Sequence, residues 1–471
     1  MDDSIAQALA KVPFRITDPE LIPAERYYDP EFFELEKKHL WPKVWQMACR
    51  LEEIPEVGDY TVYNILDRSV LLLHTSDGVK AFKNACRHRG VRLAHGNGHC
   101  TDEGIVCPFH GWRWNREGEN IFVFGRELFD ERLLERAEID LAPVRCEYWA
   151  GCAFINFDDN APPLRDCLGP VAERMDARHA DKLKMDWWFG TVLPTNWKLA
   201  NEGFQEGYHV MQTHPQLHER AYRAADSYGP NFDGTRYNEG LSAREAVDLQ
   251  IVNFKRLSSG MGGMIHETEL AVLDRIADME LPDDPLLALQ AFGAAACTAI
   301  TEDARARGAD MFDILKVQSE VEFNAVEYMF PHYFLLPTFG AMSSYRIRPL
   351  TPETCFFELW SLVIRPEDEP YDTPIEPTVI PYDSPDFPEI PRQDYSNLPI
   401  QQLGLHDIDF MRLGKGEKKG PGRQFSGGEG MISNCHRLVD GFLAGLDRET
   451  LRKGENVTNS GFNETILDIG F

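Results

Sequence analysis

Short runs of apolar residues, separated by Gly and Asp, dominate the first third of the chain. The stretches 60–63 and 70–74 are rich in Tyr, Val and Leu. Similar short runs follow at 104–107, 112–115, 120–124 and 151–157. This texture is typical of antiparallel strands. We therefore predict a small β-rich domain over residues 45–160.

The remaining chain mixes helical and strand patterns. A helical segment is expected before residue 45, where Pro30 suits a first helical turn. Residues 195–325 are predicted to be mainly helical, and a closing helix is expected near 433–446. The apolar runs 327–336, 341–348 and 355–364 predict neighbouring strands of a curved sheet, with a turn at 349–352. The fold class is therefore α+β.

Residues 366–399 have little periodicity and contain nine prolines. Such a composition predicts a long excursion over the surface. The expected organisation is residues 1–44 as a helical segment of a larger domain, 45–160 as the small β domain, and 161–471 as the rest of the larger domain.

Charge and composition exclude several classes of partner. The 471 residues carry 48 Lys and Arg against 76 Asp and Glu, a net charge of −28, which disfavours nucleic acid and anionic membranes. The start of the chain lacks the pattern of a secretory signal, and the longest apolar run, 291–300, is about half a membrane span. A cytoplasmic protein is expected, in which the 10 cysteines are thiols or metal ligands rather than a disulfide scaffold.

Two Cys/His loops stand out in the β-rich region. The sequence C-R-H-R-G at 86–90 is followed by C-P-F-H-G-W at 107–112. A Rieske cluster takes two thiolates on one iron and two imidazoles on the other, and each loop offers one of each. The predicted ligands of a [2Fe–2S] cluster are Cys86, His88, Cys107 and His110. A Cys2His2 zinc site is the alternative, although zinc fingers pair Cys with Cys and His with His.

A second metal site is indicated in the helical region. His209 and His214 follow the stretch N-W-K-L-A-N-E-G-F-Q-E-G-Y at 196–208. Two imidazoles and one carboxylate form the facial triad of non-heme Fe(II) oxygenases. A spacing of five residues places the two side chains about 140° apart on a straight helix, so we expect a bulge or a break between them.

Together these motifs resemble the signatures of Rieske-type non-heme iron, aromatic-ring-hydroxylating oxygenases, large (alpha) subunit. The resemblance covers about residues 20–450. It implies a Rieske domain inserted into a helix-grip-like catalytic domain, with one [2Fe–2S] cluster and one mononuclear Fe(II) per chain. It also implies that Asp407 is the third iron ligand, from the D-x3-M pattern at 407–411, with Asp409 as the fallback.

Further site residues follow from the same resemblance. Asn201 and Glu206 match catalytic positions, and the family's acidic residue at the place of Glu206 bonds across a subunit interface to a cluster histidine. Most members have Asp there, whereas a subset that includes carnitine-type monooxygenases has Glu. Phe204 and Met211 are candidates for the wall of the substrate pocket.

The resemblance implies an oxygenase that activates O2 with electrons derived from NAD(P)H. A ferredoxin, a flavoprotein reductase or both would deliver them, to a homotrimer or an α3β3 assembly with a small β subunit. The expected reaction is hydroxylation or dihydroxylation of an apolar aromatic, polycyclic or terpenoid substrate, as in aromatic hydrocarbon catabolism. Two alternatives stay open: a monooxygenase or N-dealkylase of a quaternary or tertiary amine, and a Rieske electron carrier without chemistry of its own.

Overall fold

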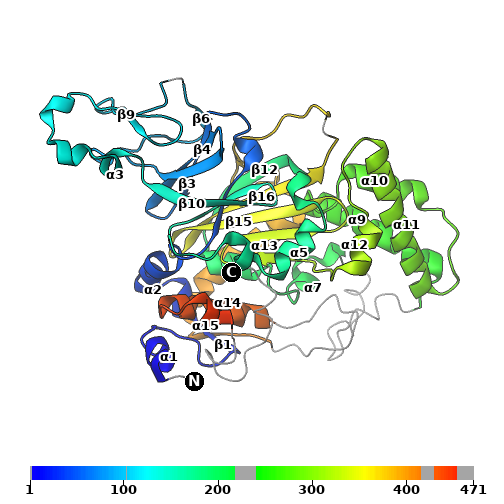
Figure 1. The fold of residues 1–471 in the computed structure, drawn as a ribbon. Coiled ribbons are helices and arrows are strands. Elements are labelled where there is room, and N and C mark those ends of the chain that lie inside the picture. Colours follow the sequence, from blue (N-terminus) through cyan, green and yellow to red (C-terminus); the bar gives the residue numbers. More distant parts are fainter. Residues whose placement is uncertain (1–2, 102, 218–239, 367, 415–428, 453–470) are drawn as a thin grey trace. The chain divides into compact units, whose positions relative to one another are not determined.

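The computed structural model describes residues 3–101, 103–217, 240–366, 368–414, 429–452 and 471. Two compact units account for the chain. One, the catalytic unit, comprises residues 1–41, 168–372 and 377–471, and the other, the Rieske unit, comprises 42–167 and 373–376. The Rieske unit is thus an insertion between two segments of the catalytic unit (Figure 1).

The Rieske unit is built on a seven-stranded sheet in the order β2-β11-β10-β5-β4-β3-β6. Its pairs are antiparallel, and each predicted run of this region coincides with a strand. The strands are β2 (Gln46–Arg50), β3 (Asp59–Ile65), β4 (Arg68–Thr75), β5 (Gly78–Lys83), β6 (Gly98–His99), β10 (Pro143–Trp149) and β11 (Cys152–Asn156).

A separate three-stranded sheet, β7-β8-β9, carries the second Cys/His loop. It consists of β7 (Ile105–Val106), β8 (Arg113–Trp114) and β9 (Asn120–Phe122), followed by the short helices η4 (Arg126–Leu128), η5 (Glu131–Leu134) and α3 (Arg136–Ile139). Trp114 is fully buried and its Nε1 donates to the Ile139 carbonyl at 2.7 Å. One apolar core joins this sheet to the larger one through Leu71, Leu73 and Phe82.

The catalytic unit contains a six-stranded sheet in the order β13-β14-β15-β16-β12-β17. The pairs are antiparallel except β12 with β17. The strands are β12 (Leu183–Leu193), β13 (Glu327–Met329), β14 (Tyr333–Pro337), β15 (Met342–Thr351), β16 (Thr354–Ile364) and β17 (Thr378–Val379). The sheet confirms the predicted α+β class, although β15 and β16 stay paired to Thr351 and Thr354, which moves the predicted turn to residues 352–353.

Helices of the N-terminal segment belong to the catalytic unit. Asp29 caps α2 (Pro30–Leu35) by accepting from the Phe32 amide at 2.7 Å, and Pro30 occupies the first turn as expected. The neighbouring helices are α1 (Asp3–Leu9), η1 (Ala24–Tyr27) and η2 (Glu36–Leu40). A small sheet pairs β1 (Leu21–Pro23) with β18 (Phe410–Arg412), near the C-terminal end.

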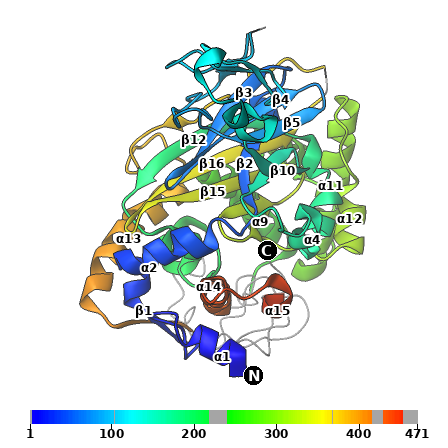
Figure 2. The same cartoon turned by 60° about the vertical axis from the view of Figure 1, so that its left-hand side comes forward.

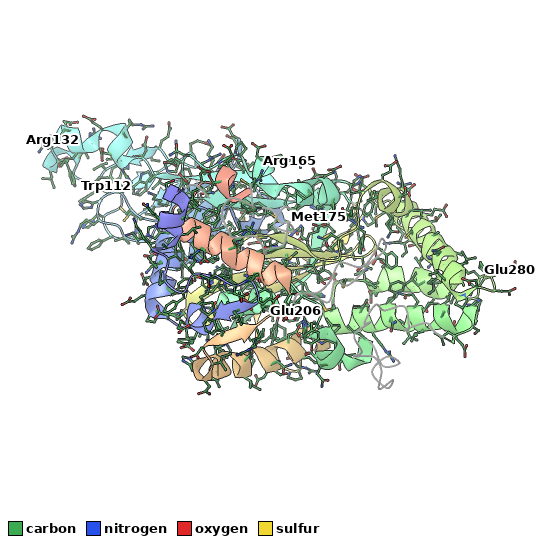
Figure 3. All side chains as sticks on the ribbon, turned by 90° about the horizontal axis from the view of Figure 1, so that it is seen from below. Trp112, Arg132, Arg165, Met175, Glu206 and Glu280 are labelled. Atoms are coloured by element: carbon green, nitrogen blue, oxygen red, sulfur yellow. The ribbon has the colours of Figure 1, made fainter. Side chains whose placement is uncertain are left out.

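Four helices pack together at one end of the catalytic sheet (Figures 1 and 2). They are α9 (Ala243–Met261), α10 (Glu267–Ile276), α11 (Pro285–Ala306) and α12 (Ile314–Glu320). Glu280, labelled in Figure 3, marks the tip of this helical region between α10 and α11. By length and composition α11 could cross a membrane, but buried core helices pass the same test. Its Phe292, Ala296 and Ile300 are buried against the rest of the protein.

The proline-rich segment differs from the prediction at its C-terminal end. Residues 389–399 begin a helix, α13 (Glu389–Gly404), instead of continuing as a surface excursion. Pro391 lies in the first turn, where the backbone needs no N–H donor, so only Pro399 interrupts the helix interior. Ile390, Tyr395 and Leu398 are buried. The prediction was wrong here because we gave the high proline content more weight than the helical spacing of these apolar residues.

Candidate metal centres and their surroundings

A break in the helix, as predicted, brings His209 and His214 together. After α6 (Trp197–Glu202) the chain turns and forms only the short helix α7 (Val210–Thr213). His209 precedes α7 with helical dihedrals, whereas His214 follows it with φ −120° and ψ 59°, outside the helical region. The two rings consequently lie edge to face, with centroids 5.5 Å apart and an interplanar angle of 79°. Segment 218–239 follows and lies outside the described residues.

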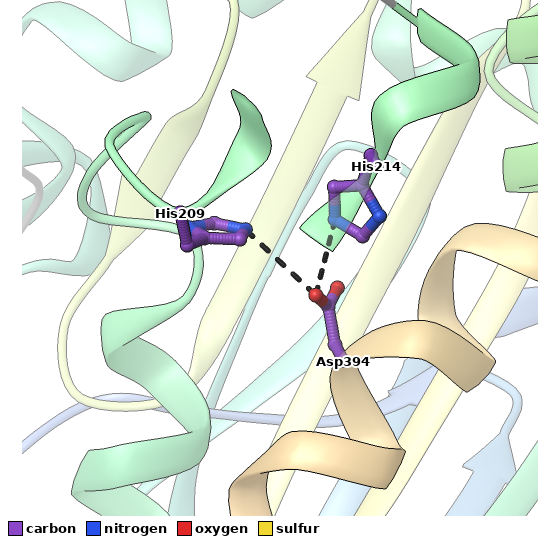
Figure 4. Close-up of side chains that lie close together, drawn as sticks. All are labelled: His209, His214 and Asp394. Carbon is purple, nitrogen blue, oxygen red and sulfur yellow. Dashed lines mark ion pairs between the residues drawn. The ribbon is translucent and has the colours of Figure 1, made fainter. Parts of the chain in front are cut away.

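Asp394 of α13 completes a group that could hold a metal ion. One donor atom from each of His209, His214 and Asp394 lies within 4.8 Å of the others. The Asp394 Oδ1 atom is 3.1 Å from His214 Nε2 and 3.8 Å from His209 Nε2 (Figure 4). Within the described ranges, no other group of three such side chains meets this criterion.

Hydrogen bonds fix the ring nitrogen that each histidine offers. Gln393 Oε1 lies 2.7 Å from His214 Nδ1, and because a carbonyl oxygen only accepts, Nδ1 carries the proton. The Glu206 carboxylate plays the same part for His209 Nδ1. Both rings are thereby left with an Nε2 lone pair directed toward Asp394. Such partners orient the ligands and raise their basicity in metal sites.

Negative charge gathers around His209. Burial opposes this, but the hydrogen bond to Glu206 and the charges of Glu206, Asp394 and Glu429 raise the pKa of His209. The same negative potential stabilises a bound cation. The chemistry of the donor set, two imidazoles and one carboxylate, therefore fits a divalent iron.

The predicted third ligand requires a correction. Asp407 lies in the short helix η9 (Leu405–Asp407), and both Asp407 and Asp409 are exposed. Neither belongs to the group formed with the two histidines. Asp394 stands 13 residues earlier, and Leu398 follows it at the spacing that separates Asp407 from Met411. A search for D-x3 followed by any large apolar residue would have included Asp394.

The other predicted catalytic residues lie on or after α6. Asn201 is buried, and its Nδ2 donates to the Pro331 carbonyl at 2.8 Å. Glu206, labelled in Figure 3, accepts from the His209 amide at 3.0 Å and also from the Tyr208 amide. Its bond to a neighbouring chain's histidine stays a prediction. The sequence did not point to Gln393, because this residue lies in a segment predicted to be a surface excursion and a single glutamine matches no metal-site pattern.

Phe204 packs on the aromatic face of the catalytic sheet. Its ring centroid lies 4.7 Å from that of Phe334 and 4.6 Å from that of Tyr345. Phe357 extends the same face, at 6.1 Å from Phe204. Tyr395, next to Asp394 in sequence, packs on Phe357 at 5.0 Å. The side chain of Met211, the other predicted pocket residue, lies outside the described part of the chain.

The two Cys/His loops of the Rieske unit have matching backbone geometry. In each loop the cysteine N–H donates to the carbonyl five residues later, Val91 or Trp112, at 2.8 Å. The cysteine carbonyl accepts from Gly90 or Gly111, at 2.8 and 3.0 Å. These glycines have φ of 75° and 68°, a region that disfavours other residues. The two loops therefore have the same backbone conformation, as expected of two loops that bind a cluster between them.

The four predicted cluster ligands divide by depth. Cys86 and Cys107 are buried, and His88 and His110 are partly exposed, with ring centroids 4.7 Å apart. His88 Nδ1 is buried and has no hydrogen-bond partner. An unpaired buried nitrogen is costly unless it binds a ligand. Two inner thiolates and two outer imidazoles thus fit a Rieske cluster.

Comparison with protein families gives two matches. Residues 44–123 match the Rieske [2Fe-2S] domain, and residues 172–445 match the ring hydroxylating alpha subunit (catalytic domain). The second match covers more than half of the chain. The chain belongs to the Rieske-type ring-hydroxylating oxygenase alpha subunits. The predicted class of enzyme, an oxidoreductase, and its cofactors, a [2Fe–2S] cluster and non-heme iron, are confirmed at the level of this family.

This membership also decides two alternatives. The match to a [2Fe–2S] domain argues against the zinc site, and the match to a catalytic domain argues against a bare electron carrier. The oxygenase subunit of carnitine monooxygenase from Escherichia coli is 34% identical over 197 residues, covering 41% of this chain and 52% of that protein. The oxygenase subunit of glycine betaine monooxygenase from Pseudomonas aeruginosa is 27% identical over 266 residues, covering 55% and 59%.

A solved structure of naphthalene 1,2-dioxygenase has a similar fold. It superimposes with a TM-score of 0.62 at 20% identity, covering 96% of this chain and 100% of that one. This similarity supports the predicted architecture of a Rieske domain with a helix-and-sheet catalytic domain. The chain spans about half the length of the curated relatives that it matches in sequence.

Proposed function

We propose that this protein is a monooxygenase that hydroxylates a carbon bonded to the nitrogen of a quaternary or tertiary amine. The observation that carries the proposal is the similarity to the carnitine and glycine betaine monooxygenase subunits. Glu206 supports it, because carnitine-type members of the family have Glu where most have Asp. The resulting carbinol would split into an amine and an aldehyde.

The chemistry next to the candidate iron site suits an organic cation. The rings of Phe204, Phe334, Tyr345 and Phe357 form one aromatic face, and Tyr395 joins this face to the helix of Asp394. Phe204 is the one partly exposed ring among these five, and a ring face of this kind attracts quaternary ammonium groups, by about 0.5–2 kcal/mol for each contact. A net charge of −28 also favours the approach of a cation.

Each residue of the site would have a defined part in the reaction. His209, His214 and Asp394 would hold the iron, and Cys86, Cys107, His88 and His110 would hold the cluster. When bound, the iron supplies the O2-binding centre and the cluster supplies electrons. Gln393 and Glu206 keep the Nδ1 protons of His214 and His209 in place, and the aromatic face orients the substrate and excludes water.

The partners are proposed on the same basis. Two electrons must arrive from outside for each O2, so a ferredoxin or a flavoprotein reductase that uses NAD(P)H is required. We propose a cytoplasmic homotrimer in which the Glu206 carboxylate of one chain also reaches a cluster histidine of the next. Head-to-tail contacts of this kind close into rings. An α3β3 assembly is the alternative.

The second candidate is hydroxylation of an apolar aromatic, polycyclic or terpenoid substrate. The aromatic and apolar character of the face around Phe204 favours it. A panel of quaternary amines, tertiary amines and aromatic hydrocarbons would separate the two, with O2 uptake and products measured in the presence of a reductase. Aldehyde and a shortened amine are expected from an amine substrate. Turnover of aromatics alone would overturn the amine assignment.

A further inference from the structure

Three carboxylates from separate parts of the catalytic unit gather around His209. Glu206 accepts a hydrogen bond from its Nδ1 atom, and the Asp394 Oδ1 atom lies 3.8 Å from its Nε2 atom. Glu429, which immediately precedes α14 (Gly430–Leu443), lies within electrostatic range of both His209 and Glu206. Within the described ranges, none of these three carboxylates forms an ion pair with a lysine or an arginine.

Glu429 differs from the other two carboxylates because no part of the candidate iron site uses it. Asp394 is a candidate ligand, and Glu206 orients His209. Glu429 does not belong to the group of side chains that could hold the metal ion. Its Oε2 atom accepts a hydrogen bond from the Gly414 amide, and its own amide donates to the Gly414 carbonyl at 2.9 Å. Backbone contacts thus fix the carboxylate, and its other oxygen atom has no donor in the described part of the chain.

The Glu429 carboxylate is partly buried and lacks a full countercharge. Burial raises its pKa and the charge of Glu206 adds to this effect, whereas the Gly414 amide and His209 lower the pKa. A charged group removed from water is costly unless a group of opposite charge lies close to it. His209 cannot be that group once it binds iron, because a ligating imidazole is neutral. Glu429 is therefore suited to a cation that the described residues do not supply.

A bound iron ion would not supply the missing positive charge. Ferrous iron carries two positive charges, whereas Asp394, Glu206 and Glu429 carry three negative charges when ionised. Glu202, another carboxyl group in electrostatic range of Glu429, is mostly protonated at neutral pH, because burial raises its pKa to about 8. With neutral histidines the site keeps one negative charge. A substrate with a single positive charge brings the total to zero, whereas a neutral hydrocarbon leaves the negative charge uncompensated.

A buried hydroxyl group at the same site also lacks a partner. Tyr395 follows Asp394 on α13 and is 1% exposed, and its hydroxyl group has no hydrogen-bond partner among the residues that the structure describes. This hydroxyl lies within electrostatic range of Asp394. Buried polar atoms without a partner are costly unless a ligand reaches them. The oxygen lone pairs of Tyr395 can accept the polarised C–H groups that surround an ammonium nitrogen.

We propose that Glu429 is the counter-ion of the substrate's ammonium group and that its charge makes the site selective for cations. The inference rests on the proposed function, because it assumes an amine substrate. The Glu429 carboxylate would supply the opposite charge, and the partly exposed ring of Phe204 would supply a cation–π contact. A counter-ion acts on binding rather than on the reacting bond, so its loss should raise KM and leave kcat nearly unchanged.

A cation and a neutral molecule of the same shape test the wild-type protein directly. Choline and 3,3-dimethyl-1-butanol differ at the branch point, where nitrogen replaces carbon, and thus in charge but hardly in shape. Calorimetric titration of the iron-loaded protein without O2 measures both affinities and needs no turnover. We expect choline to bind about 10–100-fold more tightly, the usual effect of one partly buried charge pair. Equal affinities, or binding of neither molecule, would overturn the proposal.

The substitution Glu429→Gln removes the charge but keeps the shape and an oxygen atom that accepts from the Gly414 amide. We expect the Kd of choline to rise about 10–100-fold, while the Kd of the neutral analogue stays the same. The KM of any amine that is turned over should rise by a similar factor, with kcat within about threefold of wild type. Iron content and the cluster spectrum should match those of wild type. A fall in kcat at unchanged KM would make Glu429 a participant in the chemistry and contradict the counter-ion assignment.

The matched control is Glu302→Gln on α11, which changes the net charge by the same amount at an exposed position. This variant should bind choline as wild type does. An equal loss of affinity in both variants would mean that overall charge, and not Glu429, attracts the cation. If no amine is turned over, the proposed function itself fails. If amines are turned over and Glu429→Gln keeps the wild-type KM, only the counter-ion assignment fails.

Discussion

The carboxylate of Asp394 is the residue on which the candidate iron site depends. Its Oδ1 atom lies 3.1 Å from His214 Nε2 and 3.8 Å from His209 Nε2. Two histidines without this carboxylate cannot hold an iron ion firmly. We expect Asp394→Ala to lose the mononuclear iron and all turnover, with the cluster absorption unchanged. Asp407→Ala is the matched control and should keep its full iron content. Iron analysis of both variants decides, since loss of iron only from Asp407→Ala would restore the D-x3-M assignment.

The negative charge of Glu206 can be separated from its shape, because glutamine has nearly the same shape and no charge. The Gln variant can still accept the proton of His209 Nδ1, so both metals should remain bound. We expect turnover to fall by a factor of about 10–100, the usual effect of losing a charged partner of a metal ligand. Glu206→Asp, which keeps the charge, should retain more activity than Glu206→Gln. Equal activity of Glu206→Gln and wild type would refute a role for the charge.

The raised pKa of Glu202, about 8, makes the folded protein's stability depend on pH. Between pH 5 and 8 the folded state holds a proton that an unfolded glutamate, with a pKa near 4.3, has released. This contribution is complete below that window and is lost as the pH rises. The free energy of unfolding of wild type relative to Glu202→Gln should therefore fall by about 1 kcal/mol per pH unit. Urea titrations of both proteins at several pH values measure this difference in unfolding free energy. A difference that does not change with pH would mean that the proton is held by another group.

At the scale of elements, α13 supplies both the carboxylate of the candidate iron site and the side chain that orients one of its histidines. Gln393 accepts from His214 Nδ1 and, at 2.8 Å, from Gln216 Nε2 of η7 (Pro215–Leu217), while the next residue is Asp394. We expect Gln393→Ala to lower iron affinity by a factor of about 10–100, because His214 loses its orienting partner. Ile400→Ala, a change of an exposed side chain on the same helix, is the control. Metal titration followed by iron analysis distinguishes them.

The same helix shows where sequence reasoning succeeds and fails. Strands such as β3 and β4 follow from local alternation, and the cluster loops follow from residues that lie within a few positions of each other. The His209–His214 break was predictable from helix geometry alone. Asp394 was not, because its identity depends on a contact across about 180 residues, and its helix was concealed by prolines whose cost vanishes in a first turn. Gln393 and Glu202 gain their meaning only from partners that folding brings close.

At the scale of the whole molecule, the residues of the two candidate metal centres lie in separate compact units of one chain. Phe109, beside the predicted cluster ligand His110, is 58% exposed, which suits a surface that meets another protein. The proposed ring of three chains would carry electrons from the cluster of one chain to the iron of the next. This arrangement predicts complementation between two inactive variants.

Co-expression of Cys86→Ser, which lacks the cluster, with Asp394→Ala, which lacks the iron, tests this route. In a random ring, half of the clusters are intact, and half of their recipients retain iron, so about a quarter of the junctions should work. We therefore expect roughly 25% of wild-type turnover from the mixture and none from either variant alone. Electron transfer confined to one chain would leave the mixture inactive, because no single chain has both centres. Mixing the purified variants without subunit exchange is the control and should stay inactive in either case.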